Sequence, residues 1–329
     1  MIQLDLFEDG TAFAFNNNDT PLWYSPTGGL NWIPLPSPPT AGGTPRVDFS
    51  SPDLGYSLSG GTLFATTDKG LSWEEMGEVP LPDARESDFA VTHDLYAVPE
   101  SDRVVVAGRG FYVRDGCPVE QTETLIWRSD DRGSSWETTR VKFPALAPEV
   151  EFLNDRVGVV LLLELEVIGR RACGNTSAGF RSSVQLTTDG GRHFREIYSA
   201  LHADQDPVTA VAMPSKKRIV LGTADGGVLL SRDQGKSFEE VATLVNPLHE
   251  QAGTPAQFAI DAVTFGTEKV GYAGTNGAGT WRTADGGMTW SLETSHQSLF
   301  GLNIGDIAAA GSTEALASGP WAVARRIAP

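Results

Sequence analysis

The sequence predicts an all-β fold, a seven-bladed β-propeller of four-stranded antiparallel blades, with six blades as the alternative. Two observations predict it: an eight-residue motif recurs six times, and short β-branched segments fill the intervals between its copies. The 36 glycines suit a chain with many tight turns. We expect residues 1–329 to form a single domain.

The clearest copy of the motif is Ser129 to Trp136, which reads Ser-Asp-Asp-Arg-Gly-Ser-Ser-Trp. Its pattern is a small hydroxyl residue, any residue, Asp, any residue, Gly, two spacers and an aromatic residue. The other copies are Thr66 to Trp73, Thr187 to Phe194, Ser231 to Phe238, Thr283 to Trp290 and a degenerate one, Ser25 to Trp32, with Thr27 in place of Asp. They begin at 25, 66, 129, 187, 231 and 283, so the intervals of 41, 63, 58, 44 and 52 residues match the length of a propeller blade.

The residue types of the motif predict a tight hairpin turn. An Asp carboxylate can accept hydrogen bonds from backbone amides one to three residues further on, and Gly adopts backbone angles that other residues avoid. The closing aromatic side chain is expected to pack beneath the next strand. The motif therefore predicts a turn that is held by its own side chains.

This motif resembles the Asp box, or BNR repeat, of sialidases, sortilin-type receptors and the propellers similar to photosystem II assembly factors. The resemblance implies that each box joins the third and fourth strands of a blade, on the rim away from the ligand face, and is structural rather than catalytic. The residues that take this role are Asp68, Asp131, Asp189, Asp233 and Asp285.

Placing each motif between a third and a fourth strand divides the chain into seven units. The expected strands are Ile2 to Phe7, Thr11 to Phe15, Leu22 to Ser25 and Trp32 to Leu35 in the first unit, and Arg46 to Phe49, Tyr56 to Leu58, Leu63 to Thr66 and Trp73 to Met76 in the second. Units three to six span about 89–140, 149–198, 207–241 and 258–294, and units three and four carry insertions expected as loops, Gly110 to Thr122 and Gly169 to Gly179. The seventh has Ile304 to Ala309, Glu314 to Ala317 and Trp321 to Arg326, and lacks a motif and a fourth strand.

Acidic residues recur in the expected innermost strands. They are Asp5, Asp48, Asp94, Glu151 and Asp306, with Asp261 one position out of register and Ala210 at the equivalent place in the fifth unit. We expect each carboxylate to accept hydrogen bonds from the backbone of the neighbouring blade. The alternative is that several of them face the axial channel and hold a cation, because crowded carboxylates raise each other's pKa unless a positive charge lies between them. We predict no other cofactor.

The long connections are expected on the face opposite the motifs, which we call the loop face. Loops on a rigid scaffold often carry binding residues, so this face is the predicted site. The candidate binding residues are Arg109, Phe111, Tyr112, His202, His249 and His296. Exposed histidines without a metal are favoured over a three-histidine metal site, and His193, inside a motif, is expected to be structural.

Cys117 and Cys173 fall in the equivalent insertions of adjacent units, so we expect a disulfide between them. A disulfide would place the protein in a secreted, periplasmic or cell-surface compartment, whereas free thiols would indicate the cytoplasm. The first residues lack the basic and apolar segments of a signal peptide, and no apolar run is long enough to span a bilayer.

The formal net charge of −17 and the pI of about 4.6 argue against nucleic acid or an anionic membrane as a partner, since the largest basic cluster in the sequence is Lys216-Lys217-Arg218. We expect a monomer.

Two functions are compatible with the sequence. The resemblance to sialidases does not extend to their active site, because Pro45-Arg46-Val47-Asp48 lacks the proline that follows the first arginine of their motif, and no other arginine is singled out by spacing. We therefore predict a non-catalytic protein that binds a protein or a glycan through the loop face. The alternative is a glycoside hydrolase similar to sialidases, which predicts a deep pocket with paired carboxylates or clustered arginines at the axial mouth of that face. The binding function predicts a shallow pocket there.

Overall fold

The computed structural model describes residues 2–16, 21–80, 89–114, 117–143, 145, 147–168, 176–201, 205–245, 258–275, 277, 279–294, 304–319 and 323–326. Every regular element in these ranges is a β-strand, so they include no helix that could cross a membrane.

The strands form consecutive antiparallel sheets in which chain order is also the order of pairing. Blade one contains β1 (Ile2–Leu6), β2 (Ala12–Asn16), β3 (Leu22–Ser25) and β4 (Ile33–Leu35), and blade two contains β5 (Arg46–Phe49), β6 (Gly55–Ser59), β7 (Thr62–Thr66) and β8 (Glu74–Glu78). Blade three contains β9 (Phe89–Ala97), β10 (Val104–Arg114), β11 (Cys117–Ser129) and β12 (Glu137–Val141), and blade four contains β13 (Ala147–Phe152), β14 (Gly158–Ile168), β15 (Thr176–Thr187) and β16 (Arg195–Ala200). Blade five contains β17 (Val208–Ser215), β18 (Arg218–Thr223), β19 (Gly227–Ser231) and β20 (Glu239–Thr243), and blade six contains β21 (Ile260–Phe265), β22 (Gly271–Thr275), β23 (Gly279–Thr283) and β24 (Ser291–Thr294). The last sheet has three strands, β25 (Asp306–Ala310), β26 (Glu314–Ser318) and β27 (Val323–Arg326).

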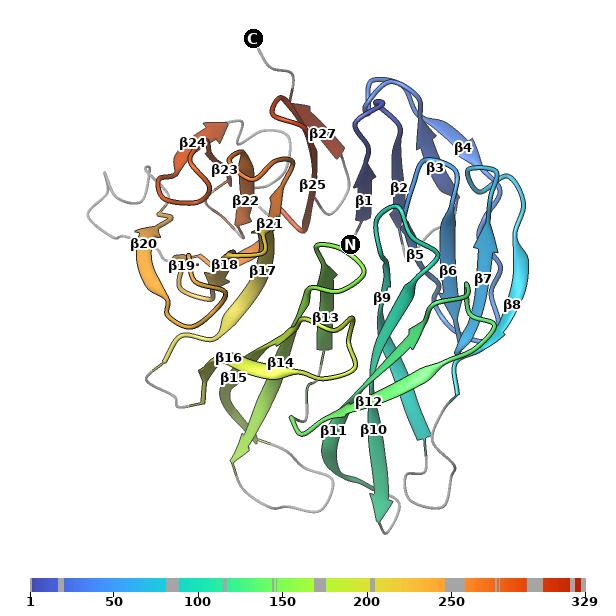
Figure 1. Ribbon diagram of the computed structural model, residues 1–329, viewed down its shortest axis with the longest axis horizontal. Coiled ribbons are helices and arrows are strands. Elements are labelled where there is room, and N and C mark those ends of the chain that lie inside the picture. Colours follow the sequence, from blue (N-terminus) through green and yellow to red (C-terminus); the bar gives the residue numbers. More distant parts are fainter. Residues whose placement is uncertain are drawn as a thin grey trace.

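The sheets are arranged radially around one axis, with the first strand of each nearest the centre (Figure 1). This arrangement confirms the predicted β-propeller. The structure has six complete four-stranded blades, the number given as the alternative, and the expected seventh unit forms only the three-stranded sheet β25–β27. That sheet lies between blade six and blade one (Figure 1).

The hydrophobic core lies between neighbouring sheets. Tyr56 and Leu58 of blade two, for example, are buried against Leu95 and Trp127 of blade three. A smaller cluster closes the ring, because Leu4 and Ala12 of blade one pack with Ala308 and Leu316 of the three-stranded sheet. Burial of apolar surface between consecutive sheets therefore continues around the axis, and the first and last sheets take part in it.

Carboxylates of the innermost strands link each blade to the next. The backbone amide of Ala97 donates to Asp48, that of Val150 to Asp94 at 2.8 Å, and that of Met213 to Glu151 at 3.1 Å. The amide of Leu4 donates to Asp306 at 2.9 Å. These bonds confirm the prediction for Asp48, Asp94, Glu151 and Asp306, whereas Asp261 accepts no hydrogen bond from a described residue.

Blade five departs from this rule because Ala210 stands where the other blades carry an acid. There the hydroxyl of Thr209 donates to the carbonyl of Ile260 at 2.8 Å, so a side chain still joins the inner strands of blades five and six. The signal for this link in the sequence would have been a hydroxyl residue rather than a carboxylate.

Each of the six motifs connects the third and fourth strands of a blade, as predicted. In the motif of blade three, the hydroxyl of Ser129 accepts the amide of Gly133 at 2.7 Å and donates to Asp131 at 2.8 Å. Asp131 accepts both the amide and the hydroxyl of Ser135, at 2.8 and 2.7 Å. Equivalent bonds occur around Asp68, Asp189, Asp233 and Asp285.

The seventh motif position is therefore not the spacer that the sequence pattern assumed. It is Ser72, Ser135, Ser237 or Thr289 in four motifs, and each hydroxyl donates to the motif Asp. His193 takes this position in blade four, with its Nδ1 2.6 Å from Asp189, as expected for a structural histidine. In the degenerate copy the hydroxyl of Thr27 replaces the carboxylate and accepts the amide of Asn31 at 3.1 Å.

The fourth motif residue ties the turn to the rest of its blade. It has a positive φ in every copy, and its backbone amide donates to a carbonyl in the turn between the first and second strands. The six donors and acceptors are Gly28 to Gly10, Lys69 to Asp53, Arg132 to Asp102, Gly190 to Arg156, Gln234 to Lys217 and Gly286 to Lys269. The two kinds of turn therefore lie together on one side of the ring, which we call the motif face.

The two insertions are not simple loops. β10 and β11 pair along their length, so that Phe111 lies opposite Gln121 and Tyr112 opposite Glu120. β14 and β15 pair in the same way up to Ile168 and Thr176. These long hairpins correct the expectation of a loop over the described residues of Gly110 to Thr122, and over Thr176 to Gly179 in the second insertion. The remaining residues of the two insertions, 115, 116 and 169–175, lie outside the described part of the chain.

Candidate functional site

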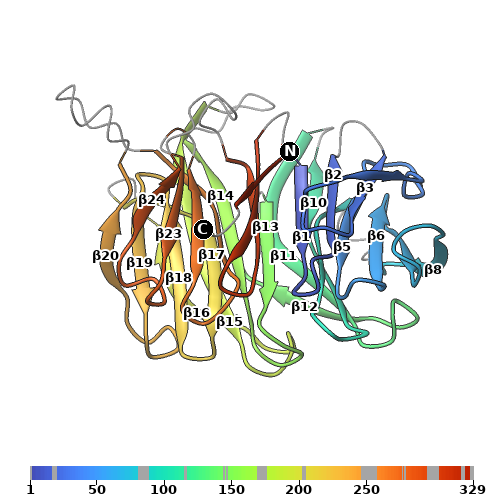
Figure 2. The same cartoon turned by 90° about the horizontal axis from the view of Figure 1, so that it is seen from above.

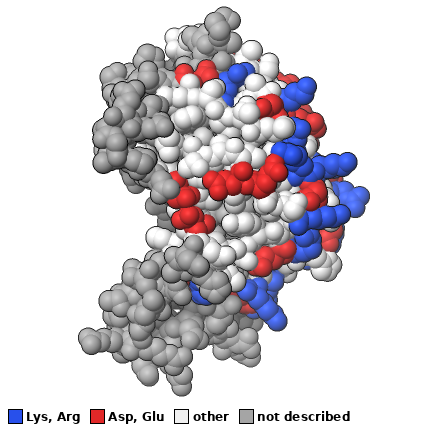
Figure 3. Space-filling view, turned by 90° about the vertical axis from the view of Figure 1, so that its left-hand side faces the viewer, with Lys and Arg blue, Asp and Glu red and all other residues white. Residues whose placement is uncertain are grey.

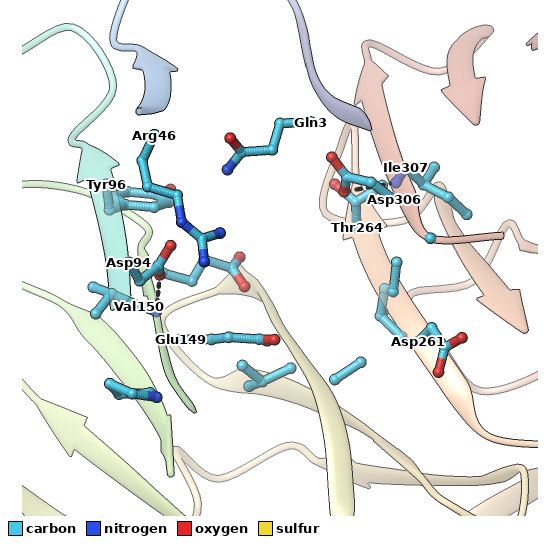
Figure 4. A pocket seen from close by; sticks show the side chains of 17 residues that line it. Gln3, Arg46, Asp94, Tyr96, Glu149, Val150, Asp261, Thr264, Asp306 and Ile307 are labelled. Atoms are coloured by element: carbon cyan, nitrogen blue, oxygen red, sulfur yellow. Dashed lines mark hydrogen bonds between the residues drawn. The ribbon is translucent and has the colours of Figure 1, made fainter. Parts of the chain in front are cut away.

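A cavity of about 430 Å³ lies on the axis, where the innermost strands begin. Residues from β1, β5, β9, β13, β17, β21 and β25 contribute to its wall. Because each innermost strand runs from this end towards the motif face, the cavity lies at the axial mouth of the loop face, the place expected for the hydrolase alternative. Figure 4 shows its charged and polar side chains projecting inward from opposite walls.

The wall of the cavity is acidic. Among the described residues that line it, the carboxyl groups belong to Asp94, Glu149, Glu151, Asp261 and Asp306, and Arg46 is the one basic residue. The guanidinium of Arg46 points into the cavity beside Asp94, and Gln3 projects from the facing wall (Figure 4). The side-chain oxygen of Gln3 is buried and has no hydrogen-bond partner among the described residues.

Burial raises the pKa of all these carboxyl groups. The pKa of Asp94 rises to about 6, although the Val150 amide and the charge of Arg46 oppose the effect. Burial also raises the pKa of Asp306 and of Asp261 to about 6 and that of Glu151 to about 7. The pKa of Glu149 rises to about 8, first through burial inside the ring and then through the neighbouring charges of Asp94 and Asp306.

Glu149 and Asp261 differ from the other three carboxylates. Asp94, Glu151 and Asp306 accept backbone amides and so hold the ring together. No described residue donates a hydrogen bond to Glu149 or Asp261, and both side chains line the cavity. These two carboxylates are therefore available to a ligand. The spacing of Glu149 and Glu151, two apart on one strand face, could have revealed the first of them in the sequence.

A second cavity of about 330 Å³ occupies the other end of the axis, towards the motif face. Tyr96 lines both cavities, and its hydroxyl donates to the carbonyl of Phe152 at 3.0 Å. Asp5 and Asp48 line this second cavity, and their side chains are hydrogen-bonded to each other. Burial and the adjacent Asp48 raise the pKa of Asp5 well above its usual range, while burial raises that of Asp48 to about 7.

None of the binding residues that the sequence singled out is among the described residues that line the cavity. Arg109 is half-buried in β10, and desolvation lowers its pKa. Phe111 and Tyr112 belong to the same strand, but their side chains are outside the described part of the structure. His202, His249 and His296 also lie outside the described residues.

The predicted disulfide and cation site stay predictions. Cys117 opens β11, and its side chain and Cys173 fall outside the described part of the chain. Among the described residues no group of three or more His, Cys, Asp or Glu side chains is placed to hold a metal ion.

Comparisons with known proteins identify the fold. No family model matches the sequence, and no curated protein sequence matches it. Among solved structures, YCF48 bound to D1 peptide has a TM-score of 0.65 and 13% identity over 100% of this chain and 93% of its own. YCF48 from Cyanidioschyzon merolae has a TM-score of 0.59 and 15% identity, covering 100% and 95%.

An enzyme shares the same architecture. The GH74 xyloglucanase from Xanthomonas campestris has a TM-score of 0.57 and 14% identity over 99% of this chain, which spans only 51% of the enzyme. At such identities these likenesses establish the β-propeller fold, which carries both binding proteins and enzymes.

Proposed function

We propose that this protein is a non-catalytic β-propeller that binds a segment of another protein at the axial mouth of the loop face. The observation that carries the proposal is the acidic cavity, in which Glu149 and Asp261 accept no hydrogen bond from a described residue. A cavity of about 430 Å³ falls within the usual range of ligand pockets and admits one or two side chains of a bound segment. The likeness to YCF48 bound to D1 peptide agrees with a peptide ligand.

The charge of the cavity defines the ligand. Among the residues described at the cavity, five carboxyl groups face one arginine, so a Lys or Arg side chain of the partner would relieve their mutual repulsion. Binding of a cation also favours the ionised form of each carboxyl group. Affinity should therefore increase as the pH rises through the range of about 6 to 8, where Asp261 and Glu149 titrate.

An array of short peptides with Lys or Arg at varied positions tests this function. The wild-type protein should retain peptides with an accessible basic side chain, and Glu149→Gln with Asp261→Asn should abolish their retention. Glu74→Gln with Glu75→Gln, on the exposed outer strand of blade two, removes the same charge elsewhere and serves as the matched control. Retention that is indifferent to the first pair, or equally sensitive to the second, would contradict the proposal.

A glycoside hydrolase is the second candidate. It is favoured by Glu149 and Asp261, because a carboxyl group with a raised pKa can act as a general acid while a second one ionises at lower pH. Hydrolysis of xyloglucan or sialyl oligosaccharides that Glu149→Gln abolishes would replace the binding function with this one. Retention of glycans instead of peptides, without hydrolysis, would make the ligand a glycan.

We also propose that the six motifs are Asp boxes and that their aspartates are structural. The hydrogen bonds of Asp131 to Ser129 and Ser135 support this role. A disulfide between Cys117 and Cys173, an extracytoplasmic location and a monomeric state are proposed with it. Titration of thiols in the denatured, unreduced protein tests the first two, since two free thiols would exclude the disulfide, and sedimentation velocity tests the third.

A further inference from the structure

The motif face carries a basic surface that the net charge of the chain conceals. Lys and Arg side chains gather along the right-hand edge of Figure 3, although the formal net charge is −17. We define this basic surface by exposed residues from the turns and motifs of blades four to six: Arg156, Arg192, Lys216, Lys217, Lys236 and Lys269.

The basic surface arises at one repeated position of the fold. This position is the turn residue whose carbonyl accepts the amide of the fourth motif residue. Blades two and three have Asp53 and Asp102 there, and each forms an ion pair with a basic fourth motif residue, Lys69 or Arg132. The charges of this half of the motif face therefore neutralise each other.

Blades four to six reverse the sign at the same position. Arg156, Lys217 and Lys269 occupy it, and the fourth motif residues opposite them are Gly190, Gln234 and Gly286, which carry no charge. The cation that each of these turns presents thus has no acidic partner in its own motif. At this turn position, blades four to six therefore carry an exposed positive charge where blades two and three carry the acidic partner of an ion pair.

Hydrogen bonds between neighbouring blades make the surface continuous across blades four to six. Arg195 of blade four donates to the carbonyl of Gln234 in blade five at 3.3 Å, and Arg218 of blade five donates to the carbonyl of Glu268 in blade six at 3.3 Å. Asp155 and Glu268 lie beside Arg156 and Lys269 and offset part of their charge. Arg192 also pairs with Glu137 at 3.6 Å, so the defining residues that have neither an ion pair nor an adjacent acidic residue are those of blade five.

In blade five, Lys216, Lys217 and Lys236 are all exposed, and no described acidic side chain forms an ion pair with them. The nearby acidic motif residue, Asp233, accepts the amides of Lys236 and Ser237 and the hydroxyl of Ser237. These bonds lower its pKa to about 2 and use the lone pairs of its carboxylate inside the turn.

We propose that the basic surface is a second interaction site, which binds an acidic segment of a partner protein independently of the axial cavity. A short acidic segment suits it better than nucleic acid or an anionic membrane. At physiological ionic strength the Debye length is about 8 Å, so a short ligand experiences the local lysines, whereas an extended polyanion also meets the negative remainder of the molecule.

The test uses a fluorescein-labelled oligoglutamate peptide and the full chain, with binding measured by fluorescence anisotropy. Lys216→Glu with Lys217→Glu should weaken binding about tenfold. The matched control is Arg140→Glu with Lys142→Glu at the outer edge of blade three, which changes the net charge equally and should leave the affinity unchanged. Carbodiimide coupling of the bound peptide should attach it to lysines of blade five.

Several outcomes would overturn the proposal. They are absence of binding, equal weakening by both pairs of substitutions, coupling outside blades four to six, or tighter binding to duplex DNA or to vesicles rich in anionic lipid than to the peptide. Should the Glu substitutions unfold the protein, Lys216→Gln with Lys217→Gln provides the same comparison with a smaller expected loss. A peptide that still binds when Glu149 and Asp261 are replaced separates this site from the axial cavity.

Discussion

The carboxylate of Asp306 accepts the backbone amide of Leu4 at 2.9 Å, a hydrogen bond between residues 302 positions apart in the chain. The hydroxyl of Ser318 adds a bond of 2.8 Å to the carbonyl of Ile2 at the same junction. The three-stranded sheet and blade one are thereby joined by side chains that bind the backbone, with an apolar cluster beside them. This junction holds the two ends of the propeller together.

Replacing Asp306 by Ala should destabilise the protein by about 1–3 kcal/mol, because the amide of Leu4 would be buried without a partner. Asp306→Asn retains an acceptor and should cost less. Urea denaturation followed by tryptophan fluorescence measures both. The control is Asp155→Ala at an exposed position. An equal loss of unfolding free energy in that variant would show that the hydrogen bond between Asp306 and Leu4 makes no particular contribution to stability.

Ser129→Ala should also cost about 1–3 kcal/mol, since it leaves the buried amide of Gly133 without its acceptor. Ser134→Ala, at the exposed sixth position of the same motif, should be nearly neutral. Thermal denaturation of the two variants gives the comparison. If Ser134→Ala proved as damaging, the hydroxyl of Ser129 would not be what holds the turn.

Gly133→Ala should be more destabilising than Gly42→Ala. The two glycines have almost the same φ, 93° and 92°, so both substitutions impose the same backbone strain. An added Cβ at Gly133 would lie 2.5 Å from a methyl group of Leu63 in blade two, whereas one at Gly42 meets nothing within 4 Å. The difference between their free energies of unfolding therefore measures the packing between blades, and equal losses would refute tight contact there.

Stability should fall as the pH rises from about 4 to 7. Asp48 and Glu151 have folded-state pKa values of about 7, above their values of 3.8 and 4.5 in a solvated chain, so the folded state binds more protons in this range. Asp189 has the opposite shift, to about 2, and loses stability only below pH 4. Guanidinium denaturation across this range should show the slope, and Asp48→Asn should reduce it. Stability that increases from pH 4 to 7 would contradict the burial of these carboxyl groups.

The sequence predicts most of the fold because repeated local chemistry determines it. In each blade the motif marks the end of the third strand and the start of the fourth, as Ser129 to Trp136 does between β11 and β12. The acidic residues of the innermost strands mark the first strand of most blades. The length of the β10–β11 hairpin, which carries Phe111 and Tyr112, could not be predicted from the sequence, because it is set by pairing between the two strands rather than by a local turn signal.

The candidate site was less predictable. Arg46, Glu149 and Asp261 come from three different blades, and only the closed ring brings them to one cavity. The basic surface was missed for the same reason, since Arg156, Lys217 and Lys269 are more than fifty residues apart in sequence and become neighbours through the order of the blades. Spacing within a motif can be read from a chain, but proximity between repeats depends on the number and packing of the blades.

Each motif is anchored to the neighbouring turn through a carbonyl oxygen, an atom that every residue type possesses. The side chain at that turn position is consequently not needed for this hydrogen bond, and aspartate, arginine, lysine and glycine all occur there. Substitutions at this position can therefore change the charge of the motif face in one blade at a time. Binding partners can then be gained or lost while the propeller itself is unchanged.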